Sequence, residues 1–213
     1  MRHPLLTKYL FAKTIVIDEG YSDEIRWQDK LHFEDVDEST FLKELGWVIL
    51  TSGMKTEVIS NRFCRISNCF YNWVSARKIW DNAKSCLNSA LKFFNHKLKI
   101  TAIINAAEHV AKIGFAKLKQ AIQKDPINTL RMFKFIGPIT AFHLAKNIGI
   151  SIAKPDRHLQ RIARLEGYND VQEFCQDIAE MSGDKIQVVD VVLWRYATIE
   201  PNYLRIFSII NCS

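Results

Sequence analysis

The chain has 213 residues, and 48% of them are hydrophobic. This is enough to fill the core of one domain, or a core that two lobes share. Its 29 basic and 23 acidic residues give a formal charge of +6, which favours a polyanionic partner. No stretch is apolar for long enough to cross a bilayer, and five cysteines without zinc spacing or a disulfide framework exclude a stapled or zinc-bound scaffold. We therefore expect a cytoplasmic monomer with reduced thiols, associated with the nucleoid or, in a eukaryote, nuclear.

Apolar residues recur at helical spacing along most of the chain, which predicts an all-α fold. In chain order, the sequence first predicts an extended arm at residues 13–17, because a lone β-branched run has no strand to pair with. The acidic stretch 18–40 is then predicted to be a connection. The predicted helices span residues 41–50, 57–63, 71–80, 86–94, 100–110, 116–122, 127–134, 140–148, 159–165, 171–181 and 186–197.

Gly137-Pro138 separates two of these helices, which predicts a helix-hairpin-helix at about residues 127–149. The amides of Gly137, Ile139 and Thr140 are expected to point outward at the start of the second helix. The positive end of the helix dipole there favours an anion such as a backbone phosphate. Phe135 disfavours a positive φ and predicts a locally different turn.

Asp156 stands directly before the next predicted helix, where an aspartate is either an N-cap or a catalytic carboxylate. The two roles are compatible, because a cap fixes the carboxylate.

Basic residues surround these two features. Arg157 and Arg161 lie four apart on one helical face, so they could clamp a phosphate together or pair with Glu166. His158 could reach a phosphate or a water, or be a capping or surface histidine. The candidate phosphate contacts are Lys134, Lys154, Arg157, His158 and Arg161.

Residues 136–141, reading IGPITA, followed by PDRH at 155–158 and by Arg161, resemble the signature of the helix-hairpin-helix DNA glycosylase superfamily. FKFIG at 133–137 is similar to the 3-methyladenine DNA glycosylase I branch, whereas the retained aspartate is similar to the endonuclease III and 3-methyladenine glycosylase II branches. Residues 45–60 and 189–194 resemble the family's early pocket helix and its closing helix more weakly.

The resemblance implies a single globular unit made of two helical lobes with a DNA- and base-binding cleft between them. Residues 39–152 form a helical barrel that ends in the hairpin, and residues 1–38 with 153–213 form the second lobe. The resemblance further implies that the hairpin, at Phe135, Gly137, Ile139 and Thr140, binds phosphate and that Asp156 performs the chemistry. An ionised carboxylate beside the anomeric carbon stabilises the positive charge that develops when an N-glycosidic bond breaks, and it can orient the attacking water. The implied partner is double-stranded DNA that contains a modified base.

Strand-cleaving members of the family carry a hairpin lysine where this chain has Ile139. The resemblance therefore implies a monofunctional DNA glycosylase of base excision repair, which leaves an abasic site, with alkylated purines as the leading substrates. The terminal zinc ligands of the 3-methyladenine glycosylase I type are reduced to His3 and Cys212, and the four-cysteine iron–sulfur loop is missing. We expect neither a metal nor a cofactor.

A flipped base is normally held between aromatic or apolar side chains. The candidates are Trp47, Met54, Phe70, Tyr71, Trp73 and Trp80, of which we expect only two or three to line a pocket, because aromatics at helical spacing usually belong to the core. Glu44 is either a reader of the base edge or a solvated helix residue. Val48 stands where 3-methyladenine glycosylase I enzymes carry their pocket carboxylate.

Two other classes of protein remain open at this point. A non-catalytic helix-hairpin-helix DNA-binding protein needs only a cap at Asp156, so Asn or Ser would serve equally well. An all-α interaction protein without a nucleic-acid role would use Gly137 as a plain helix C-cap.

Overall fold

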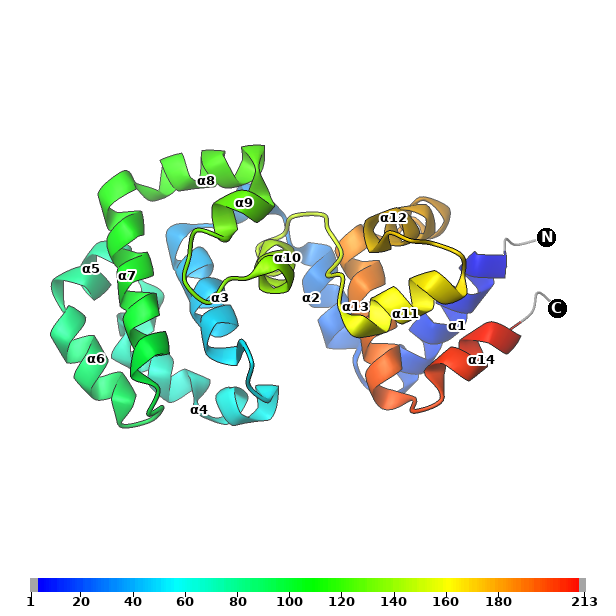
Figure 1. Ribbon diagram of the computed structural model, residues 1–213, viewed down its shortest axis with the longest axis horizontal. Coiled ribbons are helices and arrows are strands. Elements are labelled where there is room, and N and C mark those ends of the chain that lie inside the picture. The colour runs from blue at the N-terminus through cyan, green and yellow to red at the C-terminus, as the bar shows by residue number, and fades with distance from the viewer. Residues whose placement is uncertain (1–3, 211–213) are drawn as a thin grey trace. The chain divides into compact units, whose positions relative to one another are not determined.

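The computed structural model describes residues 4–210, which fold into helices joined by short connections, without a strand in that range (Figure 1). His3 and Cys212 lie outside the described residues. The chain divides into two compact units, residues 33–148 and residues 1–32 with 149–213. The boundaries predicted from the sequence, at 38/39 and 152/153, lie a few residues away. No helix of the described part of the chain is long and apolar enough to cross a membrane.

The unit of residues 33–148 is built around α3 and α7. Helix α3 buries Phe41, Leu45, Val48 and Ile49 on one face, and α7 packs against α3, α5, α6 and α8. In chain order the elements are η1 (Phe33–Asp35), α3 (Glu38–Thr51), α4 (Thr56–Cys69), η2 (Tyr71–Trp73), α5 (Ala76–Asp81), α6 (Ala83–Leu91), α7 (Lys97–Ile113), α8 (Phe115–Lys124), α9 (Pro126–Leu130) and α10 (Pro138–Asn147).

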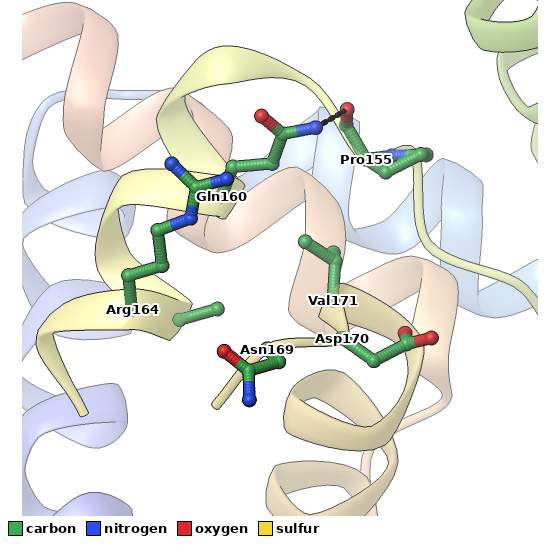
Figure 2. Close-up of a pocket in the computed structure, with 7 residues that line it drawn as sticks. Pro155, Gln160, Arg164, Asn169, Asp170 and Val171 are labelled. Carbon is green, nitrogen blue, oxygen red and sulfur yellow. Dashed lines mark hydrogen bonds between the residues drawn. The ribbon is translucent and has the colours of Figure 1, made fainter. Parts of the chain in front are cut away.

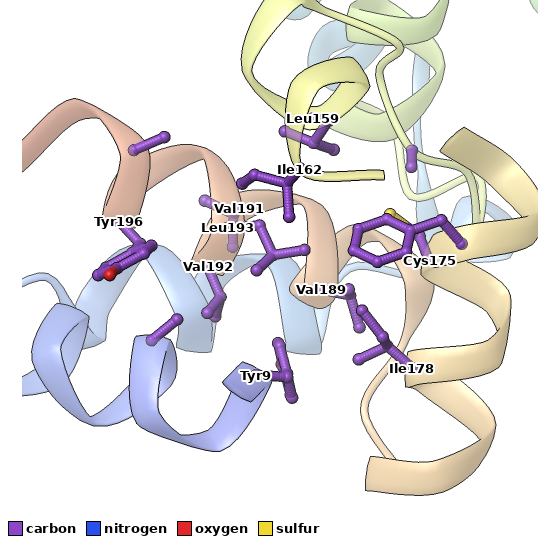
Figure 3. Packing of buried hydrophobic residues seen from close by; sticks show 14 of the residues in the cluster. Tyr9, Leu159, Ile162, Cys175, Ile178, Val189, Val191, Val192, Leu193 and Tyr196 are labelled. Atoms are coloured by element: carbon purple, nitrogen blue, oxygen red, sulfur yellow. The ribbon is translucent and has the colours of Figure 1, made fainter. Parts of the chain in front are cut away.

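The second unit is built around α13, which contacts α1, α2, α11, α12 and α14. Residues 187–193 of α13 are all buried, so this helix has no solvent face along its central turns. Figure 3 shows the side chains of Tyr9, Ile162 and Ile178 gathered around it from three helices. The elements are α1 (Pro4–Asp18), α2 (Ser22–Lys30), α11 (Arg157–Leu165), α12 (Val171–Ser182), α13 (Ile186–Ile199) and α14 (Tyr203–Ile209).

The predictions for the first forty residues were wrong. Residues 13–17 belong to α1, where Tyr9, Ala12 and Val16 are buried at helical spacing. The strand preference of a β-branched run is weak, and packing against α13 outweighs it here. The connection predicted for residues 18–40 contains α2, whose Glu24 binds Arg195 of α13.

Two predicted helices are shorter than expected. The first helix of the hairpin ends at Leu130, after which the amides of Met132 and Phe133 close tight turns onto the carbonyls of Thr129 and Leu130. The helix predicted at 71–80 starts only at Ala76, because Tyr71, Asn72 and Trp73 all have positive φ and cannot continue an α-helix.

Candidate functional site

The hairpin turn presents two unpaired amides at the start of α10. Gly137 is the N-cap, and its own amide donates to the hydroxyl of Thr140 at 2.6 Å, so the prediction that this amide points outward was wrong. Within residues 4–210 no acceptor binds the amides of Ile139 and Thr140, the second and third residues of the helix. Two free N–H groups at the positive end of a ten-residue helix form a site for an anion.

Phe135 adopts a φ of 71°, the left-handed conformation that its side chain disfavours, so the expectation that the turn avoids a positive φ at this residue was wrong. A left-handed residue with a side chain costs roughly 1–2 kcal/mol, and contacts of the side chain must offset that cost. The ring packs edge-on against His96 at 6.2 Å and lies 5.7 Å from the ammonium of Lys99. The hairpin therefore holds an aromatic residue in the left-handed conformation through contacts of its ring with His96 and Lys99.

Lys99 links this ring to the end of α3. Its side chain is buried, and Nζ donates to the carbonyls of Leu50 at 2.6 Å and of Ser52. Burial lowers the pKa of Lys99. These bonds satisfy carbonyls that the C-terminus of α3 leaves without intrahelical partners. Sequence reasoning missed this role, although a lysine on the apolar face of a helix was a usable signal.

The Asp156 carboxylate caps α11 with one oxygen only. Oδ1 accepts from the amides of His158 at 2.9 Å and of Leu159 at 3.1 Å. Oδ2 lies 3.9 Å from Nζ of Lys154 and accepts no hydrogen bond from the described residues. The side chain is 13% exposed. One oxygen therefore fixes the group. The other, which we call the open oxygen, has no hydrogen bond and only the 3.9 Å ion pair with Lys154 among the described residues.

Basic groups lie beside this carboxylate in the same unit. Arg157 and Arg161 are exposed, and Nε of Arg157 donates to Nε2 of His158 at 3.3 Å. The alternative pairing of the arginines with Glu166 is not formed, because Glu166 binds Lys8 at 2.7 Å.

The ring of His158 faces α14 and not open solvent. Nδ1 of His158 lies 3.3 Å from the hydroxyl of Tyr203, and burial lowers the pKa of the imidazole. The neutral ring is therefore favoured beside the positive charge of the arginines.

Three of the candidate pocket aromatics share one cluster in the other unit. Trp47 packs edge-on against Phe63 at 5.0 Å, Phe63 stacks on Trp73 at 6.0 Å, and Phe70 stacks on Trp73 at 4.9 Å. Phe70 and Trp73 are fully buried, so they belong to the core. Trp47, at the edge of the cluster, is only partly buried and keeps accessible surface.

The remaining pocket candidates lie elsewhere in that unit. The ring of Trp80 has the guanidinium of Arg77 at 5.0 Å and the ammonium of Lys112 at 5.3 Å. The half-buried ring of Tyr71 lies 4.8 Å from the ammonium of Lys78. Met54 is exposed in the turn after α3. The cations compete with a base for the faces of Trp80 and Tyr71.

Glu44 is not a solvated helix residue, which was the simpler of its two interpretations. Its side chain accepts from Nδ2 of the buried Asn147 at 3.0 Å, which joins α3 to the end of α10. Burial raises the pKa of Glu44, although the bond from Asn147 acts in the opposite direction. The neutral acid is therefore favoured more than in an exposed glutamate.

A small polar pocket lies next to the segment that carries Asp156 (Figure 2). It has a volume of about 160 Å³ and is lined by Pro155, Gln160, Ala163, Arg164, Asn169, Asp170 and Val171. None of the candidate base-pocket residues lines it. Across residues 4–210, no three His, Cys, Asp or Glu side chains cluster closely enough to hold a metal ion.

No family model matches the chain, and no curated protein matches it significantly in sequence. Two solved structures are similar in fold. The 8-oxoguanine glycosylase/lyase of Methanocaldococcus jannaschii, solved with DNA containing 8-oxoguanine, has a TM-score of 0.55 and 19% identity over 89% of this chain and 96% of its own. The 8-oxoguanine DNA glycosylase of Thermotoga maritima has a TM-score of 0.57 and 17% identity over 99% of this chain and 100% of its own. The chain thus has the all-helical fold of the helix-hairpin-helix DNA glycosylases.

Proposed function

We propose that this protein is a DNA glycosylase that hydrolyses the N-glycosidic bond of a modified base in double-stranded DNA. The observation that carries the proposal is the Asp156 carboxylate, with one oxygen fixed by two amides and the other free of hydrogen-bond donors among the described residues. The fold supports it, because the two solved structures described above share the fold and are DNA glycosylases by name, and one of them holds DNA that contains 8-oxoguanine.

In the proposed reaction the bond between the sugar and the base breaks with its electron pair going to the base. Positive charge grows on the sugar, and the open oxygen of Asp156 stabilises it. The oxygen of a water molecule forms the new bond to the anomeric carbon, and Asp156 accepts a proton from that water. The departing base takes up a proton from solvent, Asp156 returns its proton to solvent, and an abasic site remains. Because the carboxylate is only 13% exposed, its field is less screened than at an open surface.

The hairpin supplies affinity for the DNA backbone in this proposal. The amides of Ile139 and Thr140 and the dipole of α10 bind one phosphate oxygen. The net charge of +6 adds a long-range attraction that salt screens. A contact of this kind positions the protein without reading the sequence of the bases.

We propose that the enzyme releases the base without cleaving the strand. Ile139 has no nucleophilic group, and the buried Lys99 has its Nζ bound to the carbonyls of Leu50 and Ser52. The solved relative from M. jannaschii is named as a glycosylase/lyase, so this point needs its own test. Borohydride should trap no covalent complex between the protein and substrate DNA, and a trapped complex would contradict the proposal.

The proposed substrate is a modified purine. Alkylated purines are the candidates from the resemblance of the hairpin, and 8-oxoguanine is the base named for both solved structures. The deciding experiment incubates the protein with duplexes that carry one alkylated, deaminated or oxidised base each, and identifies free bases by mass spectrometry. Asp156→Asn, purified in the same way, controls for contaminating glycosylases.

Release by the wild type and not by the variant supports the proposal and identifies the base. If no duplex loses a base while DNA is retained in a salt-dependent manner, the protein is instead a non-catalytic helix-hairpin-helix DNA-binding protein. The two free hairpin amides favour that second candidate equally well.

A further inference from the structure

Asp156 is the last residue of a segment, residues 153–156, that belongs to no helix. Backbone groups in such a segment have no regular partners, and buried ones must be satisfied in some other way. Here the amide of Asp156 donates to the carbonyl of Lys154 at 2.7 Å, and the carbonyl of Asp156 accepts from the amide of Gln160 at 2.9 Å. The partners of the remaining backbone groups are side chains from three different helices.

Gln172, in the first turn of α12, binds both polar groups of Ala153. The amide of Ala153 donates to Oε1 of Gln172 at 2.9 Å, and Nε2 of Gln172 donates to the carbonyl of Ala153. Ala153 is fully buried, so water cannot replace these bonds. One side-chain amide thus satisfies both the donor and the acceptor of this buried residue.

Asp190, on α13, binds the next residue of the segment. Its Oδ2 accepts from the amide of Lys154 at 2.6 Å, and the side chain is 1% exposed. The neighbouring positions Val189 and Val191 point into the apolar core (Figure 3). A carboxylate buried in such surroundings is costly unless it accepts hydrogen bonds, so its presence calls for a role.

Gln160 of α11 completes the set, because its Nε2 donates to the carbonyl of Pro155 at 2.9 Å (Figure 2). Every backbone N–H and C=O from Ala153 to Asp156 therefore has a partner. Pro155 adds stiffness, because its ring fixes φ. We call Gln160, Gln172 and Asp190 the clamp.

We infer that the clamp positions the open oxygen of Asp156 for the reaction, so that Gln172 and Asp190 are positioning residues although they do not touch the substrate. This inference rests on the proposed function. Capping alone fixes Oδ1 relative to α11, but the direction of Oδ2 also depends on the path of the backbone that enters the helix. A catalytic group displaced by about 1 Å loses on the order of a hundredfold in rate.

The test compares Asp190→Val with Asp190→Asn. Valine removes the acceptor of the Lys154 amide, whereas asparagine keeps an oxygen at the same place. We expect Asp190→Val to lower the single-turnover rate of base release by about tenfold to a hundredfold, with the dissociation constant for substrate DNA changed less than twofold. Asp190→Asn should retain most of the rate. If Asp190 only stabilised the fold, Asp190→Val would change the rate of base release and the affinity for DNA together.

Gln172→Leu provides a second test in case Asp190→Val does not fold. Its matched control is Gln176→Leu, one turn further along α12, where the exposed side chain bonds only to Glu180 among the described residues. Asp184→Asn is the control for general loss of stability, because Asp184 binds Tyr9 and Lys13 and contacts no part of the clamp. Gln172→Leu should slow base release as Asp190→Val does, and both controls should keep the wild-type rate.

Equal rates for wild type, Asp190→Val and Gln172→Leu would overturn the inference while leaving the glycosylase proposal intact. If the wild type itself releases no base, the proposed function fails. The NMR chemical shifts of the amides of His158 and Leu159 then test whether the clamp fixes the position of the Asp156 carboxylate. These amides bind Oδ1 of Asp156. Shifts that move in Asp190→Val and not in Asp190→Asn support the clamp, and shifts unmoved in both overturn it.

Discussion

Gly46 lies on the inner face of α3, directly against the indole of Trp73. A Cβ added at this position would lie 2.6 Å from Cη2 and 3.0 Å from Cζ3 of Trp73. In an open helix Gly→Ala stabilises by about 1 kcal/mol, because glycine is the more flexible residue in the unfolded chain. Here the indole cannot yield easily, since it is stacked on Phe63 and Phe70 and donates to Ser67 at 2.9 Å.

We therefore expect Gly46→Ala to reverse the usual sign and to destabilise the protein by about 1–3 kcal/mol, the range for an overpacked core. In a chain of this size, that lowers the Tm by about 2–4 °C for each kcal/mol. Urea unfolding followed by tryptophan fluorescence measures the change.

The partner of the clash is tested by a double-mutant cycle with Trp73→Phe, which removes the larger ring. Gly46→Ala should cost less by at least about 1 kcal/mol in the Trp73→Phe background than in the wild type. A stabilised Gly46→Ala protein, or a cycle without coupling, would refute the reasoning that the indole is fixed.

Two further substitutions test the hairpin and α3. Burial raises the pKa of Glu44 above its ordinary 4.5, so the folded state binds the carboxyl proton more tightly than the unfolded state does. The free energy of unfolding therefore falls as the pH rises from 4.5 through the pKa of the folded state. Glu44→Gln should raise the Tm at pH 8, with the gain vanishing near pH 4, and an equal gain at both values would contradict the assignment. At Phe135, where φ is positive, Phe135→Gly should be more stable than Phe135→Ala by about 1 kcal/mol in urea unfolding, and an alanine variant of equal stability would show that the turn relaxes.

The hairpin and Asp156 could be predicted from the sequence because both depend on short-range chemistry. Gly137-Pro138 starts α10, with glycine as the N-cap and proline as the first helical residue, and Asp156 after Pro155 caps α11. Within the hairpin, however, side-chain contacts change which amides are free and which residue has a positive φ. Thr140 takes the amide of Gly137, and His96, nearly forty positions away, packs against the ring of the left-handed Phe135.

The clamp could not be predicted, because it joins residues far apart in the chain. Asp190 and Lys154 are 36 positions apart, and Gln172 and Ala153 are 19 apart. Outside the clamp, the bond from Lys99 to Leu50 joins residues that are 49 positions apart. Periodicity shows that each polar residue lies within an apolar stretch, but it does not show which backbone group that residue satisfies. The extended arm predicted at 13–17 failed for the same reason, since the packing of α1 against α13 decides its structure.

The most direct test of the central claim measures single-turnover base release by wild type and Asp156→Asn on the same modified duplex. Asparagine keeps a cap for α11 and removes the charge, so stability should change by less than about 1 kcal/mol and DNA binding should persist. We expect the rate of base release to fall by about a hundredfold or more in Asp156→Asn. An Asp156→Asn protein that releases the base at the wild-type rate would contradict it.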